Sequence, residues 1–115
     1  MNSVLLIGRM AVTPELKRTN SGTPVTRFTL AVDREGKNKG ADFISCVAWE
    51  KDAENICRYI EKGRQIAIRG RIQTGSYDKD GQKVYTTDVV IEKAEFLGSR
   101  EEPKDEPYED EYFPR

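Results

Sequence analysis

The side chains most suited to chemistry are two large aromatic residues on one predicted strand, Asp42–Trp49. Successive side chains of a strand alternate between faces, so Phe43 and Trp49 share one face, with roughly 20 Å between their Cα atoms. The opposite face carries smaller residues that suit a barrel interior: Ile44, Cys46 and Ala48. If that face points inward, the two rings are exposed and can stack on different unpaired bases. The alternative is that they pack under a loop or against a second subunit.

Basic residues are interleaved with further aromatic ones. Arg69 and Arg71 fall on the outward face of the predicted strand Gln65–Gln73, and Arg27 is a further outward candidate. The other candidates lie in loops, beside a helix and on a hairpin: Arg34, Lys37, Lys39, Lys51, Lys62, Tyr77 and Tyr85. Cations contact phosphates and release counterions, while stacking contributes about 1–3 kcal/mol per base and is nearly blind to base identity. The pattern therefore predicts a surface that binds single strands without reading sequence and binds duplexes poorly.

The residues that most enzymes need are scarce. The 115 residues include no histidine and only two cysteines, Cys46 and Cys57. This removes the common general base, the usual nucleophile pairs with histidine, and histidine-based zinc sites. A metal-dependent nuclease would need clustered carboxylates, whereas the acids of the body are scattered: Asp33, Asp42, Asp88 and Glu92. We therefore expect no enzyme activity, no cofactor and no metal.

The cellular location is inferred from two features of the sequence. Few cysteines fit a reduced compartment better than a disulfide scaffold. The N-terminal apolar run, Val4–Ile7, is too short for a secretory signal or a membrane span. We expect a cytoplasmic, nucleoid-associated protein with no membrane partner.

Strands dominate the predicted elements. Apolar alternation and turn residues predict strands at Val4–Arg9, Val25–Val32, Asp42–Trp49, Gln65–Gln73 and from Val84 to about Phe96. In the second, Phe28 and Leu30 share one face. In the fourth, Ile66, Ile68 and Ile72 share one face. The last two strands form an extended hairpin that turns near Asp80-Gly81.

One helix is predicted, over Asp52–Lys62. Ala53, Ile56, Cys57 and Ile60 form one apolar stripe at helical spacing. Asp52 is placed to cap the N-terminus, and Gly63 is placed to adopt a left-handed conformation after the helix. The predicted order is therefore three strands, one helix and two more strands. This is the order of an all-β, five-stranded OB-fold barrel with its helix between strands 3 and 4.

The charge pattern divides the chain into two parts. Residues 101–115 hold seven acids against two bases, with three of the five prolines and no aliphatic residue, although the whole chain has a net charge of only −1. Such a segment buries too little apolar area to offset its ordering entropy. We therefore expect an OB-fold domain over residues 1–100, mildly basic, followed by a disordered acidic C-terminal tail over residues 101–115.

Several segments resemble the bacterial-type single-stranded DNA-binding protein family over roughly residues 2–98. They are Val4–Arg9, Thr13–Leu16, Asn20–Gly22, Phe28–Ala31, Trp49–Tyr59, Lys62-Gly63, Gly70–Thr74 and Tyr85–Val90. The resemblance implies an OB-fold, typically homotetrameric, that wraps single-stranded DNA in replication, recombination and repair and is not an enzyme.

The resemblance also assigns roles to individual residues. Phe43, Trp49 and Tyr77 match the family's base-stacking aromatic positions, whereas a further stacking aromatic has no counterpart in Arg34–Lys37. Basic or polar residues of the family match Lys51, Lys62 and Arg71.

The tail resembles the family's acidic C-terminal segment, which recruits replication and repair proteins through a terminal Pro-Phe. Here the last residues are Asp110, Glu111, Tyr112, Phe113, Pro114 and Arg115, so Phe and Pro are reversed and an arginine follows. The tail would recruit partner proteins, or regulate DNA binding by competing for the basic groove.

Two other functions stay open at this stage. The barrel could be a protein–protein adaptor or oligomerisation module without direct DNA binding. It could also bind RNA, since no position identifiable from the sequence reads a 2′-hydroxyl.

Overall fold

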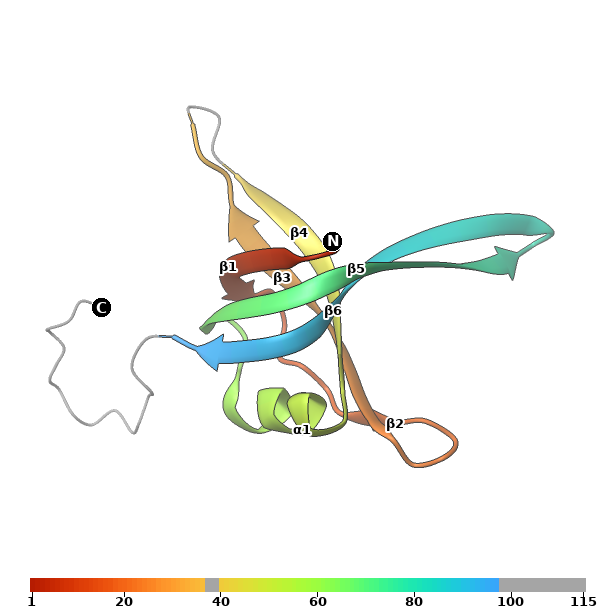
Figure 1. Cartoon of the computed structure of the whole chain (residues 1–115), viewed down its shortest axis with the longest axis horizontal. Coiled ribbons are helices and arrows are strands. Elements are labelled where there is room, and N and C mark those ends of the chain that lie inside the picture. The colour runs from red at the N-terminus through yellow and green to blue at the C-terminus, as the bar shows by residue number, and fades with distance from the viewer. Residues whose placement is uncertain (37–39, 98–115) are drawn as a thin grey trace, which may run out of the picture.

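The computed structural model describes residues 1–36 and 40–97 (Figure 1). Its elements are β1 (Val4–Met10), β2 (Lys17–Arg18), β3 (Pro24–Asp33), β4 (Ala41–Trp49), α1 (Glu50–Tyr59), β5 (Gln65–Lys79) and β6 (Gln82–Phe96). All five predicted strands are confirmed, and β2 is added to them. The expectations for Lys37, Lys39 and the tail residues Asp110, Glu111, Tyr112, Phe113 and Pro114 lie outside the described residues.

Five strands close into a ring. β1 pairs with β5, β5 with β6, and β4 with β3, all antiparallel. A short parallel pairing of β4 with β6, at Cys46–Val89 and Val47–Val90, and an antiparallel pairing of β1 with β3 complete the circuit. The predicted five-stranded OB-fold barrel with its helix between the third and fourth of these strands is confirmed.

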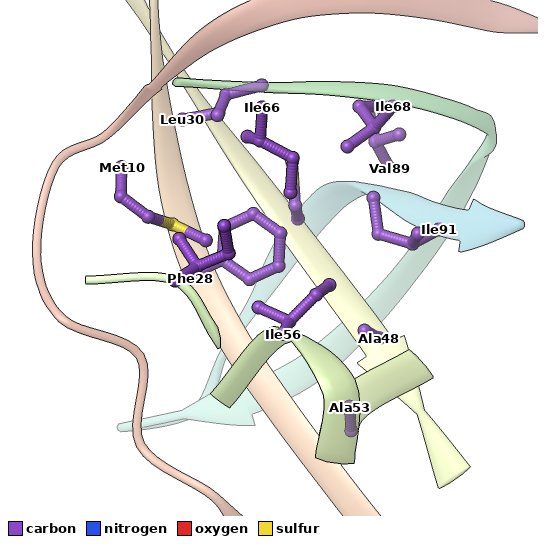
Figure 2. Packing of buried hydrophobic residues seen from close by; sticks show 12 residues of the cluster. Met10, Phe28, Leu30, Ala48, Ala53, Ile56, Ile66, Ile68, Val89 and Ile91 are labelled. Atoms are coloured by element: carbon purple, nitrogen blue, oxygen red, sulfur yellow. The ribbon is translucent and has the colours of Figure 1, made fainter. Parts of the chain in front are cut away.

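The barrel interior follows the predicted alternation. Phe28 and Leu30 of β3 are buried, as are Cys46 and Ala48 of β4. Ile56 of α1 points into the same cluster, so the helix closes one end of the barrel (Figure 2). These inward positions require the alternate residues of β3 and β4 to point outward.

The ends of α1 differ from the prediction. The helix begins at Glu50, directly after β4, with Trp49 as its N-cap and no capping side chain, so Asp52 lies inside the first turn. Glu50 has a φ of 57°, which lets the chain turn from strand to helix without a loop. The helix ends at Tyr59, so Gly63, whose φ is 87°, serves the turn before β5 instead of following the helix directly.

The β5–β6 hairpin extends out of the barrel (Figure 1). Asp80 and Gly81 have φ values of 53° and 78°, which is the backbone that a tight hairpin turn requires. Ile66 and Ile68 are buried on the inward face of β5. Ile72 continues the same alternation, but it is 46% exposed because β5 has left the barrel there.

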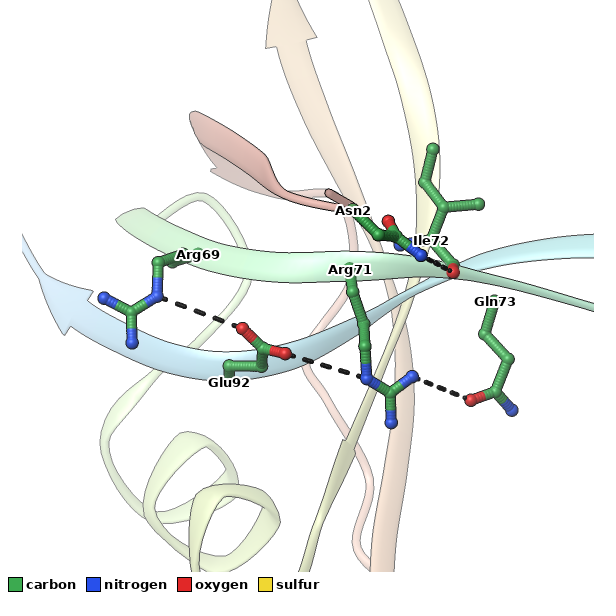
Figure 3. Close-up of polar contacts among 6 residues, drawn as sticks. All are labelled: Asn2, Arg69, Arg71, Ile72, Gln73 and Glu92. Atoms are coloured by element: carbon green, nitrogen blue, oxygen red, sulfur yellow. Dashed lines mark hydrogen bonds and ion pairs between the residues drawn. The ribbon is translucent and has the colours of Figure 1, made fainter.

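The side chain of Asn2 supports β5 at that exit. Its Nδ2 donates to the Ile72 carbonyl at 2.9 Å, and its Oδ1 accepts from the Ile72 N–H at 2.8 Å (Figure 3). The amide therefore replaces a strand residue beyond the start of β1 and satisfies both backbone groups of Ile72.

Candidate nucleic-acid interface

The outer face of β4 exposes the two predicted rings. Phe43 is 69% exposed and Trp49 is 42% exposed, whereas Cys46 and Ala48 between them are fully buried. The outward orientation predicted for both aromatic residues is confirmed. Val47 shares their face but is buried beside its neighbour in β6, Val90.

A half-buried carboxylate connects three strands on this face. Asp88 of β6 accepts hydrogen bonds from Ser45 Oγ at 2.7 Å and from Arg27 Nη1 at 2.8 Å. Burial alone would raise the pKa of Asp88, but the two hydrogen bonds and the charge of Arg27 outweigh it and hold the pKa below its ordinary value. Asp88 therefore stays ionised at neutral pH and keeps Arg27 of β3 aligned over the sheet.

Arg69 and Arg71 both point outward, and both face one carboxylate. Glu92 lies 4.0 Å from Arg69 Nε and 3.6 Å from Arg71 Nε (Figure 3). A register shift in the β5–β6 ladder leaves Glu92 as an extra residue, which places it between the two arginines. Such exposed ion pairs are weak, at about 0–1 kcal/mol, so a phosphate can compete with Glu92 for either arginine.

The two arginines occupy different parts of the barrel wall. Arg69 lies opposite Leu5 of β1. Arg71 lies opposite Val90, which is itself paired with Val47 of β4. The structure therefore places Arg71 toward the rings and Arg69 toward β1.

The two hairpin tyrosines are exposed on opposite faces. Tyr77 pairs with Val84, and Tyr85 pairs with Ser76, the residue next to Tyr77. Opposed residues of an antiparallel ladder share a face and adjacent residues do not. Tyr77 continues the outward face of β5 that carries Arg71, whereas Tyr85 continues the face that points inward within the barrel.

The remaining predicted cations lie at three separate places. Arg34 Nε donates to Asp42 Oδ1 at 2.8 Å beside the β3–β4 loop. Lys51 is exposed two residues after Trp49, at the start of α1, while Lys62 lies beyond the opposite end of that helix. Of these three, Lys51 is the nearest to a ring in the sequence.

A groove beside Trp49 was missed by sequence reasoning. Its volume is about 340 Å³, and its lining residues are Glu15, Lys17, Val25, Arg27, Val47 and Trp49. Lys17 was not a candidate because β2, the short strand that carries it, has no strong sequence pattern. Only the pairing of β2 with β3 brings Lys17 to the groove.

The described residues contain two free thiols and no cluster of metal ligands. Among residues 1–36 and 40–97, no three acidic or cysteine side chains are grouped to hold a metal ion, and no helix there is long and apolar enough to cross a membrane. Cys46 and Cys57 are not joined in a disulfide. Burial, with a smaller contribution from Asp88, raises the pKa of the Cys46 thiol to about 12, which keeps it protonated.

A closed barrel with outward aromatic rings and neighbouring cations defines the class of OB-folds that bind single-stranded nucleic acids. A family model described as the single-strand binding protein family matches residues 1–97, so the chain belongs to that family. The resemblance inferred from the sequence is confirmed.

Relatives with the name single-stranded DNA-binding protein match most of the chain. The protein of Clostridium perfringens is 55% identical over 101 residues, which cover 86% of this chain and 67% of the relative. A third such protein of Clostridium acetobutylicum is 52% identical over 102 residues, covering 84% and 71%. One from Listeria innocua is 45% identical over 106 residues, covering 88% and 66%. The chain thus spans about two thirds of the length of these relatives.

Proposed function

We propose that this chain binds single-stranded DNA without reading its sequence and protects it during replication, recombination and repair, without acting as an enzyme. Membership of the single-strand binding protein family supports this function. The observation that carries it is the outward orientation of Phe43 and Trp49 on β4. A protein–protein adaptor would not need two unpaired rings beside arginines on the same barrel wall.

In this proposal rings and cations have separate tasks. Phe43, Trp49 and Tyr77 stack on bases, which favours unpaired strands because the bases of a duplex are already stacked. The proposed phosphate contacts come from the exposed cations, with Tyr85 as a further contact: Arg34, Lys51, Lys62, Arg69 and Arg71. Of the two arginines of β5, Arg71 is the better placed to contact DNA near the rings. It pairs with Val90 of β6, which pairs with Val47 of β4.

We also propose that the chain forms a homotetramer. Leu5 and Ile7 of β1 are 74% and 56% exposed in the single chain. Together with Ala67, the neighbour of Ile7 in β5, they form an apolar strip that a second copy would cover. Arg69 borders this strip, so its contact with DNA depends on how the copies assemble.

Further proposals rest on the family resemblance alone. The acidic segment over residues 101–115 recruits replication and repair proteins or competes with DNA for the cations. The protein works in the cytoplasm, associated with the nucleoid.

The test is a titration of the intrinsic fluorescence of Trp49, the only tryptophan, with oligo-dT at two salt concentrations. Quenching is expected, with tighter binding at low salt because phosphate contacts release counterions. A duplex of equal length is the control and should bind poorly. Binding with unchanged fluorescence at saturation would remove Trp49 from the site, and no binding at low salt would favour the adaptor.

The opposite faces of the hairpin allow a paired prediction. Tyr77→Ala should weaken oligo-dT binding by about 1–3 kcal/mol, because it removes a ring on the face that continues from Arg71. Tyr85→Ala removes an equally large exposed ring from the other face and should have a smaller effect. Fluorescence titration of both variants checks this. A larger loss of affinity for Tyr85→Ala would place the bound DNA on the opposite face of the hairpin.

A further inference from the structure

The groove beside Trp49 is built from one continuous face of three strands. Lys17 of β2 lies opposite Val25 of β3, which lies opposite Trp49 of β4. One step along, Arg27 lies opposite Val47. Opposed residues point to the same side of a sheet, so these five side chains converge. The sixth lining residue, Glu15, comes from the loop before β2.

The groove is apolar in its floor and cationic at its edges. Val25 and Val47 form the floor beside the Trp49 ring, and the volume of about 340 Å³ lies at the small end of the range for ligand pockets. Two cations and one carboxylate line it. This combination suits a flat aromatic group that carries a negative charge, and it suits an uncharged apolar segment less well.

Arg27 is held in place for contact with an anion. Asp88, whose side chain is only 15% exposed, accepts one of the five N–H groups of the guanidinium at 2.8 Å. The Arg27 side chain is nevertheless 62% exposed. A guanidinium held through one N–H group can present its other donors to a phosphate and loses less side-chain entropy when it does so.

Lys17 supplies charge that no carboxylate balances. Within the described part of the chain, no acidic side chain lies within 4.0 Å of its ammonium group, whereas Arg27 is neutralised by Asp88. Lys17 is therefore the groove residue whose contact with a phosphate would release counterions most directly.

We propose that Lys17 and Arg27 extend the DNA-binding surface onto β2 and β3, because both line the groove beside Trp49. They contact the phosphates on either side of the nucleotide whose base stacks on Trp49 over Val25 and Val47. Asp88 is a positioning residue that acts through Arg27. This inference rests on the proposed function and adds β2 to the binding surface.

The test compares two neighbouring cations of β2. Lys17→Gln should raise the Kd for oligo-dT about 3- to 10-fold at low salt and reduce the salt slope of binding by about 1. Arg18→Gln changes the net charge identically, but Arg18 does not line the groove and donates instead to the Gly22 carbonyl at 3.2 Å. It should leave both quantities unchanged. Glu15→Gln should tighten binding, because it removes the one carboxylate that lines the groove.

The outcomes separate this extension of the binding surface from the proposed function. If the unmodified chain binds and Trp49 is quenched, but Lys17→Gln and Arg18→Gln behave alike, the extension is overturned and the function stands. If the unmodified chain does not bind at low salt, the function itself fails. A change in light-scattering mass for Lys17→Gln, with its salt slope intact, would show that a second copy occupies the groove and would also overturn the extension.

Discussion

Alanine in place of Trp49 is expected to weaken oligo-dT binding by about 1–3 kcal/mol, roughly 5- to 160-fold in Kd. The ring is the wall of the groove and is exposed on β4, so its removal deletes a stacking platform without removing a charge. The salt slope should therefore stay unchanged. Because the variant lacks the only tryptophan, the anisotropy of a labelled oligonucleotide is the measurement.

Two matched variants give this prediction its controls. Tyr59→Ala removes another exposed ring, which packs against Phe96 with 5.8 Å between centroids and lies on α1 instead of β4, so affinity should not change. Arg71→Ala should lower the salt slope by about 1, because it removes a charge. If Trp49→Ala and Arg71→Ala changed the slope alike, the division between stacking and phosphate contacts would be wrong.

The orientation of side chains along strands could be predicted from sequence because it depends on local geometry. A period of two fixes which residues share a face, and the burial of Phe28 and Leu30 follows from it, as does the exposure of Phe43 and Trp49. Ile72 keeps this period but is 46% exposed, because periodicity does not say where a strand leaves the barrel.

The ends of the helix depended on contacts that local propensity does not describe. Asp52 is a good capping residue by type, yet α1 starts two residues earlier because the chain turns at Glu50 directly from the barrel wall. Packing of Ile56 in the core then fixes the helix position.

The polar part of the site could not be predicted because its partners are distant in sequence. Arg27 and Asp88 are 61 positions apart, and Ser45 and Asp88 are 43 apart. Arg69 and Arg71 were correctly expected to face outward, but their shared partner Glu92 depends on a register shift that leaves no sequence signal. Lys17 reaches Trp49 only through the β2–β3 pairing.

Gly70→Ala is expected to cost the barrel about 3 kcal/mol of stability, the upper part of the usual range for overpacking. Gly70 lies at the register shift between β5 and β6, and a Cβ there would collide with the backbone carbonyl oxygen of Val90 and lie 2.9 Å from Val89 Cγ1. Backbone cannot move aside as a flexible side chain can. The expected fall in melting temperature is roughly 12–24 °C, measured by circular dichroism.

Gly75→Ala is the matched control, five positions further along the same strand. Its Cβ would meet only the hydroxyl of Thr86, at 3.3 Å, and that side chain can rotate away. The melting temperature should change little, because the hairpin there lies outside the barrel. Equal destabilisation by the two variants would contradict a close backbone crossing at Gly70. Val90 pairs with both Arg71 and Val47, which lies beside the rings. If the added methyl group displaces β6, Gly70→Ala should therefore also weaken oligo-dT binding at temperatures where the variant is still folded.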